Sequence, residues 1–377
     1  MSEFQASNFK KENGGTPDLL GKTELTSPYF FVPPSGDTAS RPQSCAPGTL
    51  RFNTDVGTLE IYRGDTIGWE YIQKREEQYL GGGTGSNAGT GTRGLILGGY
   101  DGSNRIDTVE FITISTLGNA ADFGNLTGVA SRNGGCGSSI RALRGGGGTP
   151  SLVNVIDEHN FATTGNFNDF GDLTISRSQL GSLSNATRGV WAGGNPETDR
   201  IDYVTIASSG NAVDFGNLSA AKQTPCGCAN PTRGLWMGGE ITPANVNTID
   251  FITIATTGDA SDFGDLSVTQ RLGTGFSNSI RGFKATGEQQ SGNIDFLIIA
   301  TLGNATNFGS LSQSRVEGGG MTSPTRGVIA GGYAPSTVNT MDYIEIATTG
   351  NAIDFGDLSA ATSFIGDGAT SNGHGGL

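Results

Sequence analysis

The residue types that most often carry chemistry are either scarce in this chain or repeated at one spacing. Only His159 and His374 are histidines, which disfavours a metal centre built from several imidazoles. The C-x-C pair Cys226 and Cys228 does not have the spacing of a metal motif. One position of an internal repeat is always arginine, which favours a structural role over a catalytic cluster: Arg93, Arg141, Arg188, Arg233, Arg281 and Arg326. We expect no metal and no cofactor.

Carboxylates are numerous, but none is singled out. The 36 acidic residues offer many pairs for glycoside hydrolysis, without a pattern that selects one. Asp-Phe-Gly occurs in five copies without a glycine-rich nucleotide loop, so a kinase interpretation fails. We expect its aspartate to be a turn or cap acceptor. The sequence therefore predicts no catalytic residue and a protein that is not an enzyme.

Composition excludes several classes of partner. The net charge is −13, whereas nucleic-acid binding needs a basic surface, so no nucleic-acid partner is expected. No run of about 18 apolar residues is present, so no membrane insertion is expected. The first 15 residues lack an apolar core, which predicts no secretory signal and folding in a cytosol.

Glycine makes up 62 of the 377 residues and follows an internal repeat. A D/N-F-G-x-L segment recurs every 45 to 48 residues, with its aromatic residue at Phe123, Phe170, Phe215, Phe263, Phe308 and Phe355. An acid opens an apolar segment in the same phase, at Glu110, Asp157, Asp202, Asp250, Asp295 and Asp342. Two markers in phase over six copies define one structural unit, used six times.

Each unit reads as four short strands. In the fourth copy these are a glycine-rich stretch, RGLWMGG, the alternating IDFITIA, and DFGDL, with the T-T-G-D-A turn between the last two. Four strands in about 45 residues, repeated six times, predict a six-bladed β-propeller over residues 93–377. The small residues of the glycine-rich strand should let backbones approach closely, with Cys136 and Cys228 packing as small hydrophobes.

The unit is similar to kelch repeats, which place a glycine doublet after one strand. The doublets here are Gly98-Gly99, Gly146-Gly147, Gly193-Gly194, Gly238-Gly239 and Gly331-Gly332, whereas the fifth copy has Thr286-Gly287. This resemblance implies an architecture and says little about function. We expect 362–372 to supply the missing strand of the first unit and close the propeller. The alternative is that the glycine-rich segment from Gly81 supplies it.

The first 92 residues do not share the repeat. Residues 1–47 are proline-rich and should form an extended anchoring arm. Residues 48–80 read as a small β-meander, which favours a homo-oligomer, with a trimer through the meander as one expectation. Residues 81–92 read as a glycine-rich linker. The candidate anchoring residues are aromatic: Tyr29, Phe30, Phe31, Trp69 and Tyr71.

The segment GTLRFNTDVGTLEIYRGDTIGWEY resembles a motif of tail fibres and other virion proteins of tailed bacteriophages. The TIATTGNAxDFGDL repeats resemble those of marine cyanophage structural proteins. These resemblances imply a virion structural protein of the tail, baseplate, fibre or capsid surface, assembled in the host cytoplasm and bound to other virion proteins by its N-terminal region. Adhesion to a host surface glycan or protein is one task; a glycan-processing enzyme and a purely architectural decoration protein are the alternatives.

The loops between the second and third strands differ in every copy, and so do the stretches that lead from a fourth strand to the next unit, whereas the other two turns barely change. Binding residues usually lie on variable loops over a rigid scaffold, so these loops form the candidate partner-binding face. Unconstrained loop drift is the alternative. The candidate residues are Tyr100, Asp101, Arg105, Glu197, Arg200, Glu240 and Tyr333.

Overall fold

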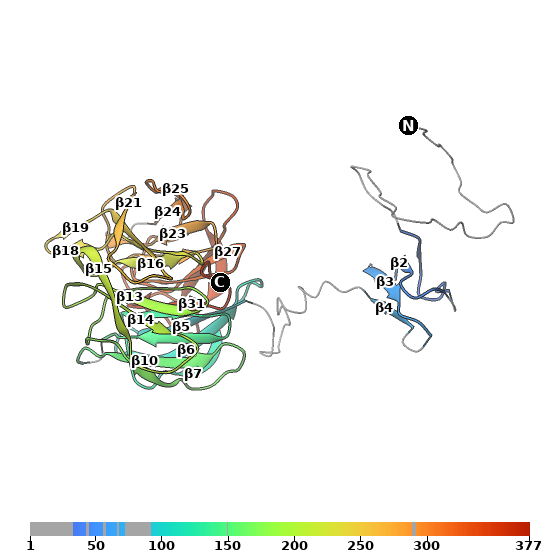
Figure 1. Cartoon of the computed structure of the whole chain (residues 1–377), viewed down its shortest axis with the longest axis horizontal. Helices are drawn as coiled ribbons and strands as arrows, with labels where there is room; N and C mark the ends of the chain where they lie inside the picture. Colours follow the sequence, from blue (N-terminus) through green and yellow to red (C-terminus); the bar gives the residue numbers. More distant parts are fainter. Residues whose placement is uncertain are drawn as a thin grey trace. The chain divides into compact units, whose positions relative to one another are not determined.

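The computed structural model describes residues 33–42, 45–55, 58–65, 68–71, 92–148, 150–288 and 292–377. Two compact units, Met1–Arg75 and Glu76–Leu377, make up the chain and are treated separately (Figure 1). The fold is all-β over the described residues, which contain no helix long and apolar enough to span a bilayer. Most of the predicted arm (1–32) and of the predicted linker (81–91) lies outside these residues.

The first unit contains one four-stranded sheet. Its strands are β1 (Ser35–Gly36), β2 (Leu50–Asn53), β3 (Thr58–Tyr62) and β4 (Trp69–Tyr71), in that order. β2, β3 and β4 are antiparallel neighbours, as the meander prediction requires. β1 pairs parallel with β2 and was not predicted, because Pro33 and Pro34 just before it mark the segment as extended without indicating a partner.

The described part of the second unit contains six sheets of four or five strands, which we number in chain order, and one two-stranded hairpin. Sheet 1 has the order β31 (Ala369–Ser371), β5 (Arg93–Tyr100), β6 (Arg105–Thr113) and β7 (Ala121–Asn125). Sheet 2 has the order β30 (Gly366–Asp367), β8 (Asn133–Gly137), β9 (Arg141–Gly145), β10 (Val155–Asn160) and β11 (Asn168–Asp172). Sheet 3 has the order β12 (Gly181–Ser184), β13 (Arg188–Ala192), β14 (Thr198–Thr205) and β15 (Val213–Lys222).

The remaining three sheets repeat this arrangement. Sheet 4 has the order β16 (Cys226–Ala229), β17 (Arg233–Met237), β20 (Thr248–Thr253) and β21 (Ser261–Asp265), with the hairpin β18 (Glu240–Ile241) and β19 (Ala244–Asn245) in its connection. Sheet 5 has the order β22 (Thr274–Ser277), β23 (Arg281–Ala285), β24 (Asn293–Ile298) and β25 (Thr306–Ser310). Sheet 6 has the order β26 (Gly319–Thr322), β27 (Arg326–Ala330), β28 (Thr340–Glu345) and β29 (Ile353–Asp357).

The C-terminal segment completes sheet 1. β31 pairs antiparallel with β5, with Ala369 opposite Ile96. The expectation that residues 362–372 supply the missing strand is therefore confirmed. β30, just before it, pairs parallel with β8 and so ties the same segment to sheet 2.

Each sheet is bonded to the next through its fourth strand. The carbonyl of the D/N-F-G phenylalanine accepts a hydrogen bond from a turn glycine of the next sheet, as Phe123 does from Gly165 (2.7 Å). The same bond joins sheet 6 to sheet 1, from Gly118 to the Phe355 carbonyl (3.0 Å). A Cβ on Gly124 would lie 2.2 Å from the Gly165 carbonyl oxygen, which explains the glycine after each phenylalanine.

The aspartate of D-F-G is not the turn acceptor that the sequence analysis predicted. It lies exposed inside the fourth strand, as at Asp122 in β7. The acceptor is instead an asparagine or aspartate in the turn after the third strand, whose side chain binds a backbone N–H of the neighbouring sheet. The acceptor residues are Asn119, Asn166, Asn211, Asp259, Asn304 and Asn351.

The first strands of the sheets approach one another backbone to backbone. A Cβ on Gly227 would lie 2.1 Å from the Ser182 carbonyl oxygen, and one on Gly275 the same distance from the Gly227 oxygen. β31 likewise contacts both β26 and β8. This confirms the expectation that small residues in these strands permit close approach.

The apolar core is divided among the sheet interfaces. Six buried clusters occur among the described residues, each built from two neighbouring sheets, and one of them joins sheet 6 to sheet 1. The D/N-F-G phenylalanines are all buried in these clusters. All six clusters lie in the second unit.

Candidate functional site

The predicted partner-binding residues lie in or beside the connections between second and third strands, and most of their side chains contact other residues of the chain. Tyr100 stacks on Phe364 with ring centroids 5.1 Å apart. Asp101 accepts hydrogen bonds from the backbone N–H groups of Ser103 (2.8 Å) and Asn104 (2.7 Å). These bonds lower the pKa of the Asp101 carboxyl and close the loop as an Asx turn.

Most of the other residues on this face link neighbouring sheets. Glu197 in sheet 3 accepts hydrogen bonds from the N–H (3.0 Å) and the hydroxyl (2.6 Å) of Thr242 in the sheet 4 connection. Glu240 forms an ion pair with Arg271, which also binds Glu288 at 2.9 Å. These contacts therefore connect the loops of neighbouring sheets to one another.

The remaining candidates on the face make few side-chain contacts within the chain. Arg105 donates to the Ser131 hydroxyl (3.1 Å) and Arg200 to the Thr174 hydroxyl (3.2 Å). Tyr333 bonds to Val316 through its backbone, while its side chain stays exposed. Tyr333 is thus the candidate whose side chain is most available to a partner.

The repeated arginines have the structural role that the sequence predicted. Each starts a second strand and donates to a backbone carbonyl of the next sheet, as Arg188 does to Ile254 (2.7 Å). Arg326 closes the series by donating to Ser115 of sheet 1 (3.1 Å). Each guanidinium also lies over an aromatic ring of its own sheet, 4.5 Å from Tyr203 for Arg188.

The repeated acids form a set of buried ion pairs that the sequence analysis did not identify. In sheet 6 the Asp342 carboxylate lies 2.9 Å from the Arg315 guanidinium, and both side chains are fully buried. In sheet 3 Asp202 pairs in the same way with Arg177 (3.0 Å). In sheet 4 Asp250 pairs with Lys222 (2.8 Å). These three cations all precede a first strand, seven residues after the D/N-F-G phenylalanine.

Two sheets supply the cation from another position. For sheets 2 and 5, the residue seven positions after the phenylalanine of the preceding sheet is uncharged: Ala130 and Gln270, respectively. The cation lies instead on the second strand, directly opposite the acid. Arg144 lies opposite Asp157, at 3.3 Å. Lys284 lies opposite Asp295 in the strand register, but its ammonium donates to the Gln270 side chain and the Thr286 carbonyl instead. Burial lowers the pKa of the Lys284 ammonium to about 8.

Sheet 1 is the exception to this alternation. Its two cation positions hold Thr362 and Ile96, and its acid is Glu110. Glu110 is buried and accepts a hydrogen bond from the Ser359 N–H (2.8 Å). In the other five sheets a cation therefore appears at one position or the other, never at both. This compensation within a single chain could have been found by aligning the six copies.

A small cavity lies between the first strands and is bounded by the C-terminal segment. Its volume is about 50 Å³, room for a few water molecules and well below the ~300 Å³ at the small end of ligand pockets. At one side Asp367 accepts hydrogen bonds from the N–H groups of Ser182 (3.0 Å), Gly227 (2.6 Å) and Gly275 (3.3 Å). Burial raises the pKa of the Asp367 carboxyl to about 7, against the effect of those bonds.

The same cavity is bounded elsewhere by His374. Its Nε2–H donates to the Gly137 carbonyl (2.8 Å), while Nδ1 accepts from the Gly376 N–H (3.1 Å). Burial lowers the pKa of this imidazole to about 4. Cys136 and Cys228 also line the cavity, and burial raises the pKa of both thiols, which fits their predicted packing role.

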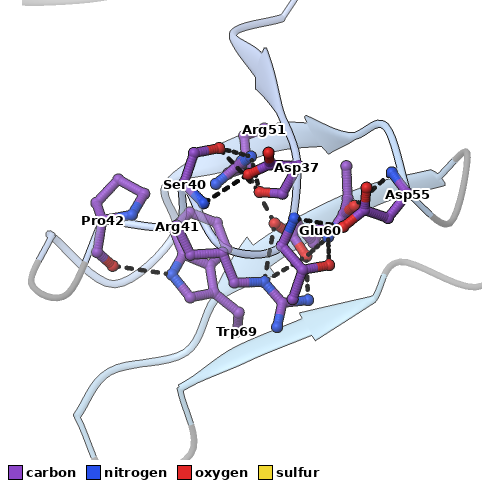
Figure 2. A network of polar contacts seen from close by, with 10 residues as sticks. Asp37, Ser40, Arg41, Pro42, Arg51, Asp55, Glu60 and Trp69 are labelled. Carbon is purple, nitrogen blue, oxygen red and sulfur yellow. Dashed lines mark hydrogen bonds and ion pairs between the residues drawn. The ribbon is translucent and has the colours of Figure 1, made fainter.

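The first unit is organised around one buried carboxylate. Figure 2 shows Arg41 and Arg51 converging on Glu60, at 2.6 Å and 3.3 Å. The Asn53 amide donates to the same carboxylate (3.1 Å). Burial would raise the pKa of Glu60, but the hydrogen bonds and charges around it leave that pKa below its ordinary value.

The predicted anchoring residues are placed only in part. Trp69 packs inside the unit: its indole N–H donates to the Pro42 carbonyl (3.2 Å) and its ring lies 5.4 Å from that of Tyr62. The backbone of Tyr71 pairs with Glu60 at the end of β4. Tyr29, Phe30 and Phe31 lie outside the described residues.

No group of three or more histidine, cysteine, aspartate or glutamate side chains suited to a metal occurs in the part of the chain that the structure describes. No protein-family model matches the chain, and no match was found among curated proteins.

Proposed function

We propose that this chain is a structural protein of a tailed-phage particle, attached through its first unit and displaying the second as a six-bladed, kelch-like β-propeller. The observation that carries the proposal is the role of the tail-fibre-like motif in the first unit. Its residues Arg51, Asn53 and Glu60 build the buried network of a sheet unrelated to the repeats. The motif therefore belongs to a unit distinct from the repeats, as an attachment domain requires.

The propeller assignment draws on the bonds between sheets. Each of the six sheets is hydrogen-bonded to the next by the same pair of groups, and sheet 6 is bonded to sheet 1 in that way. The apolar clusters and the repeated arginines follow the same cyclic order. A closed arrangement of six four-stranded sheets is the simplest one in which every interface is equivalent.

Within this proposal the displayed unit is not an enzyme. The glycan-processing alternative requires acids and a tyrosine around a central pocket of substrate size. The residues lining the central cavity include one acid, Asp367, and no tyrosine, and the space is far smaller than a sugar ring requires. Asp367 is in addition fully engaged by three backbone N–H groups.

Two tasks remain for the displayed unit. Adhesion to a host surface glycan or protein is favoured by the loop variation and by the exposed side chain of Tyr333. An architectural role is favoured by the bonds from Glu197 to Thr242 and from Glu240 to Arg271, because they commit loop side chains to neighbouring sheets.

The proposal is tested first by location. Antibodies against the purified chain should label intact phage particles, and mass spectrometry of purified particles should detect it as a stoichiometric component. Its absence from particles would refute the virion assignment.

The two tasks are then separated with host cell-surface polysaccharide. Binding without cleavage, weakened by Tyr333→Ala, indicates adhesion. If the particle-associated protein neither binds nor cleaves the polysaccharide, its role is architectural. Shortening of the polysaccharide would refute the non-enzymatic assignment.

A further inference from the structure

The sheet of the first unit has a mainly polar face inside, where Tyr62 and Trp69 also pack, and an apolar face outside. Along β2 and β3 the side chains alternate, and Arg51 stands opposite Glu60 on the face covered by the segment around Arg41. That face is buried, whereas Leu50 and Leu59 on the other face are 43% and 36% exposed. This is the reverse of the usual half-buried sheet, whose apolar face is inside.

The outward face carries four apolar side chains, of which Leu50 and Leu59 are exposed and Phe52 and Ile61 are half-buried. Leu50 pairs with Ile61 and Phe52 with Leu59 in the strand register, so four apolar side chains form two adjacent cross-strand pairs. We call these four residues the outer face. No buried apolar cluster occurs in the described part of this unit, so the outer face is its largest apolar feature.

The unit needs this surface to be covered. Buried ion pairs contribute little net stability, because desolvation offsets their attraction. Small isolated sheets are marginal without a packed apolar face. The ionic network around Glu60 fixes the geometry of the sheet, and the driving force for folding has to come from burial of the outer face.

The edge of the outer face indicates what covers it. Arg63 and Glu70 lie at its rim, 3.4 Å apart and each about half exposed. A rim with one charge of each sign is neutral and complementary to itself. When two copies of a surface meet about a two-fold axis, each residue faces the partner's counterpart, so Arg63 of each copy can face the partner's Glu70.

We propose that the outer face (Leu50, Phe52, Leu59 and Ile61) is the surface through which copies of this chain associate, sheet against sheet. Face-to-face packing of two sheets is a standard way to bury one apolar face of each. The inference adds an assembly surface to the anchoring role proposed above. It is tested on purified protein without phage particles, so its failure and that of the virion assignment are distinguishable.

The first test is the mass of the full-length chain in solution, measured by light scattering over a range of micromolar concentrations. We expect at least two chains for the wild type and one chain for Leu50→Lys/Leu59→Lys. The matched control is Val213→Lys/Ile353→Lys, which changes two apolar residues that are more exposed than Leu50 and Leu59, in the fourth strands of sheets 3 and 6. This control should keep the wild-type mass. A monomeric wild type, or a multimer that survives the Leu50/Leu59 change, overturns the proposal.

The second test does not depend on disrupting the fold. In a Cys45→Ser background, Leu59→Cys should be joined to a second copy by a short bis-maleimide, giving a band of twice the chain mass. Val213→Cys, at a more exposed position in the second unit, should stay at the mass of one chain. Equal cross-linking of the two variants, or none at residue 59, overturns the proposal even if the lysine variants unfold.

Discussion

The buried ion pair of sheet 6 gives a sharp test of how the second unit is stabilised. Arg315→Met removes the guanidinium and leaves the Asp342 carboxylate fully buried without its cation. Removing one partner of a buried pair typically costs about 3–5 kcal/mol. At about 2–4 °C per kcal/mol for a unit of this size, the melting temperature should fall by roughly 6–20 °C.

The assay is urea and thermal unfolding, followed by fluorescence of the buried residues Trp191 and Trp236. Two further variants locate the cause. Arg315→Met/Asp342→Asn removes both charges and should recover most of the loss. Arg315→Ala/Ile329→Arg moves the cation to the second strand, as in sheet 2, and should recover part of it. A loss below about 1 kcal/mol for the single variant, typical of a surface site, would refute this reasoning, as would no recovery in the charge-free double variant.

Three other outcomes follow from the structure. Gly331→Ala should destabilise by at least ~2 kcal/mol in urea unfolding, because its Cβ would lie 2.4 Å from a backbone oxygen at a φ of +60°. Arg326→Ala and Arg141→Ala should cost the same, about 1–2 kcal/mol, since each donates to a carbonyl of the next sheet and pairs with a glutamate of its own third strand. A much smaller loss for Arg326 would mean that sheets 6 and 1 separate easily. The raised pKa of Asp367 favours folding below about pH 4, an effect lost as pH rises through about 7. Wild type should therefore lose stability relative to Asp367→Asn between pH 4 and 8. His374 has a lowered pKa, and its contribution to stability is lost as pH falls below about 6.5. Because His374 is present in both proteins, the comparison isolates the effect of Asp367.

The repeat was enough to predict the strands but not the polar contacts between them. Alternation and phase located the four strands of each unit, because strand periodicity is local. The use of Ala369–Ser371 as the missing strand followed from counting strands. The acceptor role was assigned to the aspartate of D-F-G rather than to the turn residue at Asn166, since which backbone N–H lies nearby depends on the neighbouring sheet.

The ion pairs and the first unit were missed for related reasons. Arg177 and Arg144 occupy different positions of the repeat but pair with equivalent acids. No single position in an alignment of the six copies therefore reveals the ion pairs. The anchoring role predicted for Trp69 stays a prediction. The side of the sheet on which its ring lies was not predicted, because alternation alone does not show which face of β2–β4 the covering segment packs on.

The pairing of β31 with β5 has a consequence for synthesis. Arg93 and Asn372 are hydrogen-bonded although 279 residues separate them. While the ribosome is making sheets 2 to 6, the edge of β5 that β31 will occupy stays open. The first strands already made, which resemble β31 in their small residues, can pair there wrongly. Correct folding therefore waits for the arrival of residues 369–371, and a nascent chain stalled before them should be the species that chaperones hold and proteases cut.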